Sequence, residues 1–501
     1  MEHQRSEEQT GCGCCRRDFL GAMGAMGAAG GMALNYTSLA DDDIDRSDDS
    51  DERAATIQGA FLYPPSETLQ GEWWSWPGID FNAEGRQRRY MAEIEKIEKS
   101  LGIKIEMEEK PLDSQGSVAK FITRVKRSRP DGLLLIPFHH ESFAQVDAIL
   151  AEMRPTSARG KAPSARGKAP SAPGIPSVVF SCLGVKHGSV KQYRRPGVHL
   201  IQSLDNFSAL AYAMKMFRAW RTIQDSRIIS VAGGGETKDA TVPFWGTKVR
   251  RVSIKRFEKE VERTEIDAAV KDLARTFLKD AYKCIEPSDA AIVAAAQVHF
   301  ANKRILAEEQ GDAIMMDCLR RGEMMPCMSF MTFRDQGIAA GCENDLAATL
   351  TLMLVQELFD RPGFQHNPCF ETEANHYFAS HCTCPSKLNG PDEPAAPHLL
   401  RNYAHTNEPT CVPQVFWHKG DQVTMANYVP GKAPGMLIYS GEVVKSYPMP
   451  PVGGCRTNVE ITINERGDAC DVKGHHNVLF LGKHARRLRQ FARLFGMNVV
   501  I

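Results

Sequence analysis

The chain lacks features that mark several broad classes of protein. Its 61 Lys and Arg residues equal its 61 Asp and Glu residues, so no basic surplus favours binding to nucleic acid. No apolar run after residue 40 is long enough to span a bilayer. The glycine triplet 233–235 lacks the G-x-G-x-x-G spacing and the Walker lysine of nucleotide-binding loops. These absences leave a globular α/β protein of more than one core as the expected class.

The cysteines do not form a zinc pattern. Of the 14 cysteines, Cys12, Cys14 and Cys15 lie near the N-terminus. Among the other eleven, Cys382 and Cys384 form a C-x-C pair, and no second close pair completes a four-cysteine zinc site. Eleven is an odd number, so at least one thiol would be free even in an oxidising compartment. We therefore interpret most of these residues as small, buried core side chains and not as disulfide partners.

The first 40 residues have the pattern of a targeting segment, and an acidic segment follows them. Arg16 and Arg17 precede an uncharged run of Gly, Ala, Met and Leu at 21–34, and small residues follow at 38–40. This pattern predicts a twin-arginine signal peptide over 1–40, handled by the twin-arginine translocase, and export to the periplasm or the extracellular space. The acidic segment 41–56 is predicted to be a solvated linker.

The rest of the chain alternates between strand and helix patterns and then becomes all-β. Strands separated by helices predict parallel sheets in an N-terminal α/β domain at 57–205 and a central α/β domain at 206–385. Alternating runs predict a C-terminal antiparallel β domain with a terminal helix at 386–501. A tandem Ser-Ala-Arg-Gly-Lys-Ala-Pro repeat marks 157–174 as an inserted surface loop.

Carboxylates and imidazoles recur on separate segments of the last third. Glu343 precedes an apolar helical pattern, so we expect it at a helix N-terminus, where the helix dipole favours a carboxylate. The other candidates follow later in the chain: Glu371, Glu373, His381, His475 and His476. A divalent metal that also holds sugar oxygens needs this mixture of ligands.

The segments that carry these residues resemble a known family. The segments are 341–345, 371–375 with 381–383, and 474–476 before a Val-Leu-Phe-Leu strand, together with the ending 494–500. They are similar to the L-fucose isomerase/L-arabinose isomerase superfamily. The resemblance implies two α/β domains, a C-terminal β domain, a divalent metal that is usually manganese, and a homo-oligomer, either a trimer or a hexamer.

The resemblance also implies roles for individual residues. Glu343 matches the first carboxylate ligand, and Glu371 lies where the second is expected, with Glu373 as the alternative. One of His475 and His476 matches the distal metal-binding histidine. His381 matches a histidine that contacts metal or substrate in some relatives.

These residue types suit isomerisation of a sugar. Mn²⁺, or another divalent cation such as Mg²⁺, accepts hard oxygen ligands with one or two imidazoles and leaves positions open for substrate oxygens. Chelation of O1 and O2 would acidify the C2 proton, and Glu343 and Glu371 would move it through a cis-enediol. Trp417, beside His418, is either a sugar-stacking wall or core packing. His139, paired with His140, follows the apolar strand pattern at 132–137, at the strand end where α/β proteins bind ligands.

Two functions follow from these expectations. The first is a metal-dependent aldose–ketose isomerase, an intramolecular oxidoreductase, acting on a fucose- or arabinose-like monosaccharide. The second is an exported carbohydrate-binding protein that keeps the fold without turnover. Export of a sugar-metabolism enzyme is unusual, and this keeps the second function open.

Overall fold

The computed structural model describes residues 54–68, 81–154, 174–319, 321–405, 408–447 and 455–500. The predicted signal peptide 1–40 lies outside the described residues. So do the acidic segment 41–56, apart from its last three residues, and the repeat 157–174, apart from its last residue.

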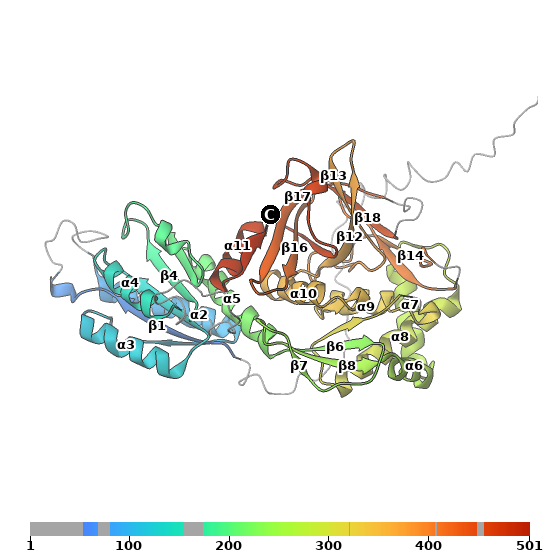
Figure 1. Ribbon diagram of the computed structural model, residues 1–501, viewed down its shortest axis with the longest axis horizontal. Helices are drawn as coiled ribbons and strands as arrows, with labels where there is room; N and C mark the ends of the chain where they lie inside the picture. The colour runs from blue at the N-terminus through green and yellow to red at the C-terminus, as the bar shows by residue number, and fades with distance from the viewer. Residues whose placement is uncertain are drawn as a thin grey trace, which may run out of the picture. The chain divides into compact units, whose positions relative to one another are not determined.

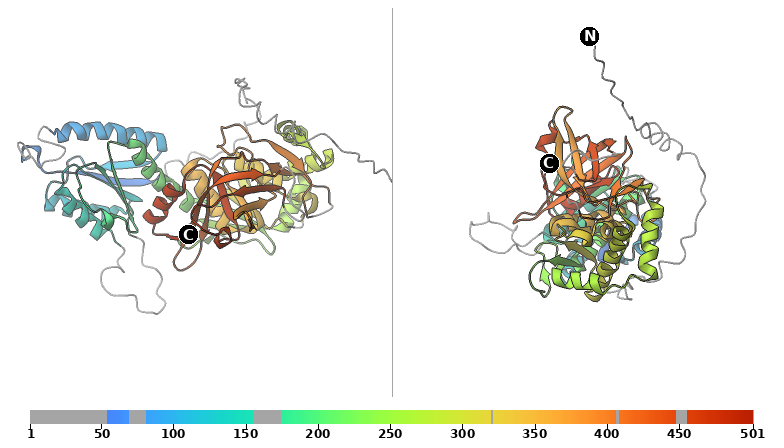
Figure 2. Two further views of the ribbon diagram at one scale, coloured as in Figure 1. Left: turned by 90° about the horizontal axis from the view of Figure 1, so that it is seen from above. Right: turned by 90° about the vertical axis from the view of Figure 1, so that its right-hand side faces the viewer.

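A five-stranded parallel sheet opens the described chain. Its strands are β1 (Thr56–Leu62), β2 (Lys104–Met107), β3 (Gly132–Pro137), β4 (Ser177–Cys182) and β5 (Val198–Ser203). Its helices are α2 (Ala83–Leu101), α3 (Gln115–Ser128), α4 (Ser142–Glu152) and α5 (Phe207–Asp225). The strand order is β2-β1-β3-β4-β5, and α2 and α5 cover one face while α3 and α4 cover the other (Figure 2). Burial on both faces explains why β3 and β4 are buried along their whole length.

A second sheet is also mainly parallel. Its strands are β6 (Arg227–Ala232), β7 (Ala240–Thr241), β8 (Lys248–Ser253), β10 (Ala313–Met316) and β11 (Ala340–Gly341), in the order β11-β10-β6-β8-β7. Only β7 is antiparallel to its neighbour among these described strands. The helices of this segment are α6 (Ile254–Arg263), α7 (Ala268–Asp280), α8 (Asp289–Glu308), α9 (Cys327–Asp335) and α10 (Leu346–Phe359) (Figure 1).

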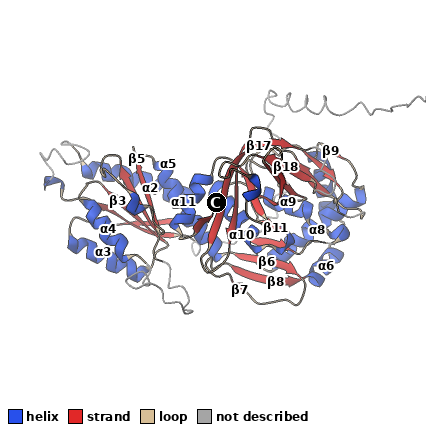
Figure 3. Ribbon diagram, turned by 45° about the horizontal axis from the view of Figure 1, so that its top comes forward, coloured by secondary structure: helices blue, strands red, loops and turns tan. Residues whose placement is uncertain are grey.

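The third sheet closes into an antiparallel barrel. Its strands are β12 (Phe364–Glu371), β13 (His376–His381), β16 (Gln422–Val429), β17 (Gly435–Ser446), β18 (Thr457–Ile461) and β19 (Asn477–Leu481). The order β16-β19-β12-β13-β18-β17 closes because β17 also pairs with β16 (Figure 3). Side chains including Trp417, Tyr377 and Tyr439 form its core. Closure leaves these strands without free edges.

Smaller elements complete the described chain. The strands β9 (Lys283–Cys284), β14 (His398–Arg401) and β15 (Val412–Val415) form a three-stranded sheet, and β20 (Asn498–Val500) pairs with β17. The helix α11 (Ala485–Leu494) precedes β20, and its Phe491 packs in the same core as Trp220 of α5, which stacks on Phe495. Short 3-10 turns occur at Ser66–Thr68, Lys191–Tyr193, Gly322–Met324, Cys342–Asn344 and Ala469–Asp471.

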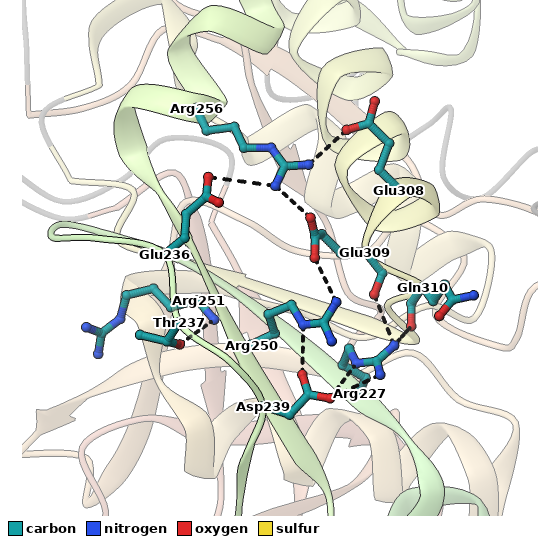
Figure 4. Close-up of polar contacts among 10 residues, drawn as sticks. All are labelled: Arg227, Glu236, Thr237, Asp239, Arg250, Arg251, Arg256, Glu308, Glu309 and Gln310. Carbon is teal, nitrogen blue, oxygen red and sulfur yellow. Dashed lines mark hydrogen bonds and ion pairs between the residues drawn. The ribbon is translucent and has the colours of Figure 1, made fainter.

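A network of ion pairs ties one edge of the second sheet to α8. Asp239 bonds Arg227 of β6 and Arg250 of β8, with N–O distances of 3.1 and 2.8 Å. Arg250 continues to Glu309 at 2.9 Å, and Glu309 also pairs with Arg256 of α6 at 2.6 Å (Figure 4). Shared carboxylates hold several cations at once, so the network stabilises this edge more than isolated surface pairs do.

The observed α/β architecture, with parallel and antiparallel sheets, agrees with the predicted fold class. The allocation of strands differs at one point: β12 and β13, inside the predicted central segment 206–385, pair with barrel strands. No disulfide joins the eleven cysteines of the described chain. Within the same residues, no helix is long and apolar enough to cross a membrane.

Candidate cation site

Glu343 lies in a strained turn at the carboxyl end of β11. The turn Cys342–Asn344 connects β11 to α10, and Glu343 and Asn344 have positive φ angles of 55° and 52°. Two such residues in succession cost on the order of 1–3 kcal/mol each, and they cluster at functional sites. The turn is held because the Ser230 hydroxyl donates to Asn344 Oδ1 at 2.8 Å and the Cys342 N–H donates to Gln365 Oε1 at 2.8 Å. Glu343 therefore precedes the helix, whose N-cap is Asp345, instead of starting it.

Two histidines from the barrel meet Glu343. His381 ends β13, and His476 immediately precedes β19; β12 lies between these two strands. His381 Nε2 is 3.4 Å from Glu343 Oε1, and His476 Nε2 is 3.5 Å from Glu343 Oε2. One ligand atom from each residue lies within 4.8 Å of the others, which suits binding of a single cation. The structure thus brings together three of the residues predicted from sequence.

Asp345 fixes the orientation of His476. Its Oδ2 accepts from His476 Nδ1 at 2.8 Å, while its Oδ1 accepts the Ala348 N–H at 2.9 Å and caps α10. A proton on Nδ1 leaves Nε2 as a lone-pair donor facing Glu343. A carboxylate behind a ligating histidine is the usual support of a metal-binding imidazole. Asp345 was not among the residues predicted from sequence, although an Asp before an apolar helical pattern is an N-cap signal.

The environment keeps the carboxylate ionised. The hydrogen bond from His381 lowers the pKa of Glu343, against the effect of its partial burial. Burial lowers the pKa of His381, but the bond to Glu343 and the nearby Cys342 thiol outweigh it and raise the pKa overall. His476 is 3% exposed, and its Nε2 makes no hydrogen bond with any described residue. A buried ring nitrogen that makes no hydrogen bond and faces a carboxylate fits the role of a cation ligand.

The residues present fit a divalent transition ion. One carboxylate and two imidazoles form a ligand set that leaves coordination positions open. Imidazoles suit zinc, iron and nickel, and a carboxylate suits manganese; magnesium prefers oxygen ligands alone. Glu343, His381 and His476 would hold the ion, and Asp345 would support His476.

The structure does not bring Glu371 or Glu373 to this site. Glu371 pairs with His376 at the far end of the β12–β13 hairpin, five residues along β13 from His381, which is about 17 Å of strand. Both glutamates are exposed. The predicted role of Glu371 as second ligand and acid/base partner is therefore wrong, and so is the alternative with Glu373. Strand register separates residues that are close in sequence.

The remaining predicted residues lie elsewhere or pack in the core. His475 is exposed, with its ring 4.5 Å from that of His476, so the neighbouring His476 is the one that faces Glu343. Trp417 is 2% exposed in the barrel core, 6.2 Å from the Phe364 ring, which corresponds to the core-packing interpretation. His139 is buried after β3, at the edge of a different sheet from Glu343.

A groove lies at the same edge of the second sheet as Glu343. Its volume is about 540 Å³, and its lining residues follow β6, β8 and β10: Gly233, Gly234, Ile254, Lys255, Glu258 and Arg321. The carboxyl ends of parallel strands share one edge, where α/β proteins bind ligands. The volume suits a small molecule, and the lining offers both charges for hydrogen bonds to a polar ligand.

Comparisons with known proteins find similar solved structures but no matching family. No family model matches the chain, and no curated protein matches it. One similar solved structure is a sugar ABC transporter (sugar-binding protein) from Bacillus halodurans, 12% identical over 64% of this chain and 91% of that chain, with a TM-score of 0.16. Another is GanP, a glucose-galactose binding protein from Geobacillus stearothermophilus, 12% identical over 61% of this chain and 89% of that chain, with a TM-score of 0.16. Likeness at this TM-score carries no argument about function.

These findings correct the predicted family. The predicted membership of the L-fucose isomerase/L-arabinose isomerase superfamily is wrong: no family model and no curated protein matches the chain, and the two solved structures named above are described as sugar-binding proteins. The resemblance rested on short segments around Glu, His and Gly residues. One of those segments, 371–375, lies on the exposed end of a hairpin instead of at the site.

Proposed function

We propose that this protein binds a small carbohydrate with the help of a divalent transition ion, without needing to turn it over. The observation that carries the proposal is the convergence of Glu343, His381 and His476, with Asp345 behind His476. When bound, the ion would supply a Lewis-acidic centre for ligand oxygens. The residues of the chain would hold and orient the ion: Glu343 supplies the negative charge, and the two histidines complete the ligand set.

The groove supplies the rest of the ligand contacts in this proposal. Lys255 and Arg321 are donors, and Glu258 is an acceptor at 3.6 Å from Arg321. A sugar offers both donors and acceptors on adjacent hydroxyls, so a lining of both charges matches it better than a lining of one sign. The predicted substrate class, a monosaccharide, is kept here as the ligand class.

Isomerisation stays a prediction. Isomerisation was predicted from a proton relay between two carboxylates, and Glu371, the second of them, lies away from the site. Among the described residues, no second Asp or Glu joins the group of possible metal ligands. Binding is therefore the simpler function for one carboxylate and two imidazoles. Manganese or another divalent cation, a trimeric or hexameric assembly, and export through the twin-arginine route also stay proposals.

The experiment compares a glutamate at the candidate site, Glu343, with one on the exposed end of a hairpin, Glu371. Protein purified without chelator is assayed for metal content, and then by calorimetry for binding of an aldose panel that includes fucose and arabinose. Glu343→Gln should lose the metal and the sugar binding, while the exposed Glu371→Gln, the matched control, should keep both. A ketose assay with added Mn²⁺ tests turnover in the same samples. Sugar binding that is insensitive to chelator, or equal in both variants, would contradict the proposal.

A further inference from the structure

A second group of possible ligands contains sulfur. Cys382, His405 and Cys455 each offer one ligand atom, and these three atoms lie within 4.8 Å of one another. They come from separate segments: Cys382 follows β13, His405 lies between β14 and β15, and Cys455 precedes β18. No two of them are close in sequence, which is why the cysteine spacing gave no sign of the group.

The distance between Cys455 and His405 matches that of two ligands in a tetrahedral site. With metal–sulfur and metal–nitrogen bonds of about 2.3 and 2.05 Å, tetrahedral geometry separates a sulfur from a nitrogen by about 3.6 Å and two sulfurs by about 3.8 Å. Cys455 Sγ is 3.5 Å from His405 Nε2. Cys455 and His405 are therefore placed to bind the same ion, and the Cys382 ligand atom lies within 4.8 Å of both. A metal bound by two cysteines and one histidine keeps a fourth position for water or another ligand.

Neighbouring contacts support two of the three residues, His405 and Cys455. The His405 ring meets the Tyr403 ring edge-on at 5.3 Å, and the Tyr403 N–H donates to Thr410 Oγ1 at 2.7 Å. The Cys455 carbonyl accepts from Asn458 Nδ2 at 2.6 Å. Supporting contacts of this kind orient ligands before an ion arrives.

The surroundings combine an apolar wall with access from solvent. Cys382 is 3% exposed in a small core with Met325, Cys327 and Val412, whereas His405 is exposed. The apolar side lowers the local dielectric, which strengthens thiolate–metal attraction. The exposed imidazole gives an ion a route to the buried thiols.

We infer that Cys382, His405 and Cys455 form a second metal site, for a thiolate-preferring ion such as Zn²⁺, separate from the Glu343 site. The two groups share no residue. His381 and Cys382 are neighbours in the chain, but His381 belongs only to the Glu343 group and Cys382 only to the sulfur group. An ion on Cys382 would tie the loop before β15 and the start of β18 to the end of β13. It would thereby fix the backbone that carries His381.

Cobalt substitution distinguishes the two sites. Thiolate ligation gives Co²⁺ an intense near-ultraviolet charge-transfer band, whereas the Glu343 site offers only oxygen and nitrogen. Reduced, metal-free full-length protein is titrated with Co²⁺ under inert gas. Wild type should bind two equivalents and show the band; Glu343→Gln should lose one equivalent and keep the band.

Variants of the sulfur group should give the opposite result. Cys455→Ser should lose one equivalent together with the band, and His405→Ala, at an exposed position, should weaken the band without unfolding the protein. Cys470→Ser changes an exposed cysteine outside the group and should leave both readouts at wild-type values. Circular dichroism checks the fold of each variant. A reduced wild type without the band, or a band that persists in Cys455→Ser, would overturn the inference.

Discussion

Replacement of Asp345 by Asn isolates the support that His476 receives. Asp345 Oδ1 caps α10 through the Ala348 N–H, and Oδ2 accepts from His476 Nδ1. Asn keeps one oxygen, which the cap needs, and presents its amide NH₂ to Nδ1. The imidazole must then accept at Nδ1 and carry its proton on Nε2, the atom that faces Glu343. The substitution therefore blocks the ligand atom itself.

The expected loss is about 10–100-fold in metal affinity, or roughly 1.4–2.8 kcal/mol, the range found for outer partners of metal ligands. Stability should change little, because Asn caps helices about as well as Asp. Competition with a metallochromic chelator measures the affinity. Asp267→Asn, at the N-cap of α7, where Asp267 accepts from the Val270 N–H at 3.0 Å, is the matched control. Equal affinity in Asp345→Asn and wild type would refute the reasoning.

Three further predictions concern stability. A saturating divalent ion should raise the free energy of unfolding by about 2.7 kcal/mol at 100 times its dissociation constant, and thermal denaturation should show this gain in wild type and not in Glu343→Gln. Burial lowers the pKa of His299 from 6.5 to about 4. The unfolded chain therefore takes up a proton that the folded protein does not, and the free energy of unfolding should fall by about 3 kcal/mol for this group as the pH drops from 6.5 towards 4. In His299→Gln, the pH dependence of the denaturation midpoint over this range should be smaller by about one proton. Asp239→Asn breaks the ion pairs with Arg227 and Arg250. Urea titrations should show a free energy of unfolding lower by about 0.5–1 kcal/mol at low salt and by much less at about 1 M salt. An equal decrease at both salt concentrations would contradict an electrostatic role.

Part of the site could be predicted from sequence because residue chemistry and local pattern were enough. A Glu before an apolar helical pattern, and His residues beside predicted strands, pointed to Glu343, to His381 and to one of the pair His475 and His476. Glu371 was misplaced because its position depends on hairpin register: β12 and β13 pair so that Glu371 lies opposite His376, away from His381. Register depends on turn geometry and cross-strand packing, which residue type does not show.

For the sheets, individual strands could be predicted from sequence, but the pairing of distant strands could not. Buried runs such as 132–137 identified parallel strands, and alternation identified the barrel strands. Barrel closure, through the pairing of β16 with both β17 and β19, is a long-range property. The convergence of Cys382, His405 and Cys455 also depends on a long-range pairing, because β13 and β18 are neighbours in the barrel. Short-range patterns carry no information about such pairings.

Anomalous X-ray diffraction from crystals grown with Mn²⁺ or Zn²⁺ tests the central claim most directly. We expect a difference peak within bonding distance of Glu343, His381 and His476, at about 2.0–2.2 Å from their ligand atoms. A crystal of metal-loaded protein with no peak among these three side chains would contradict the account.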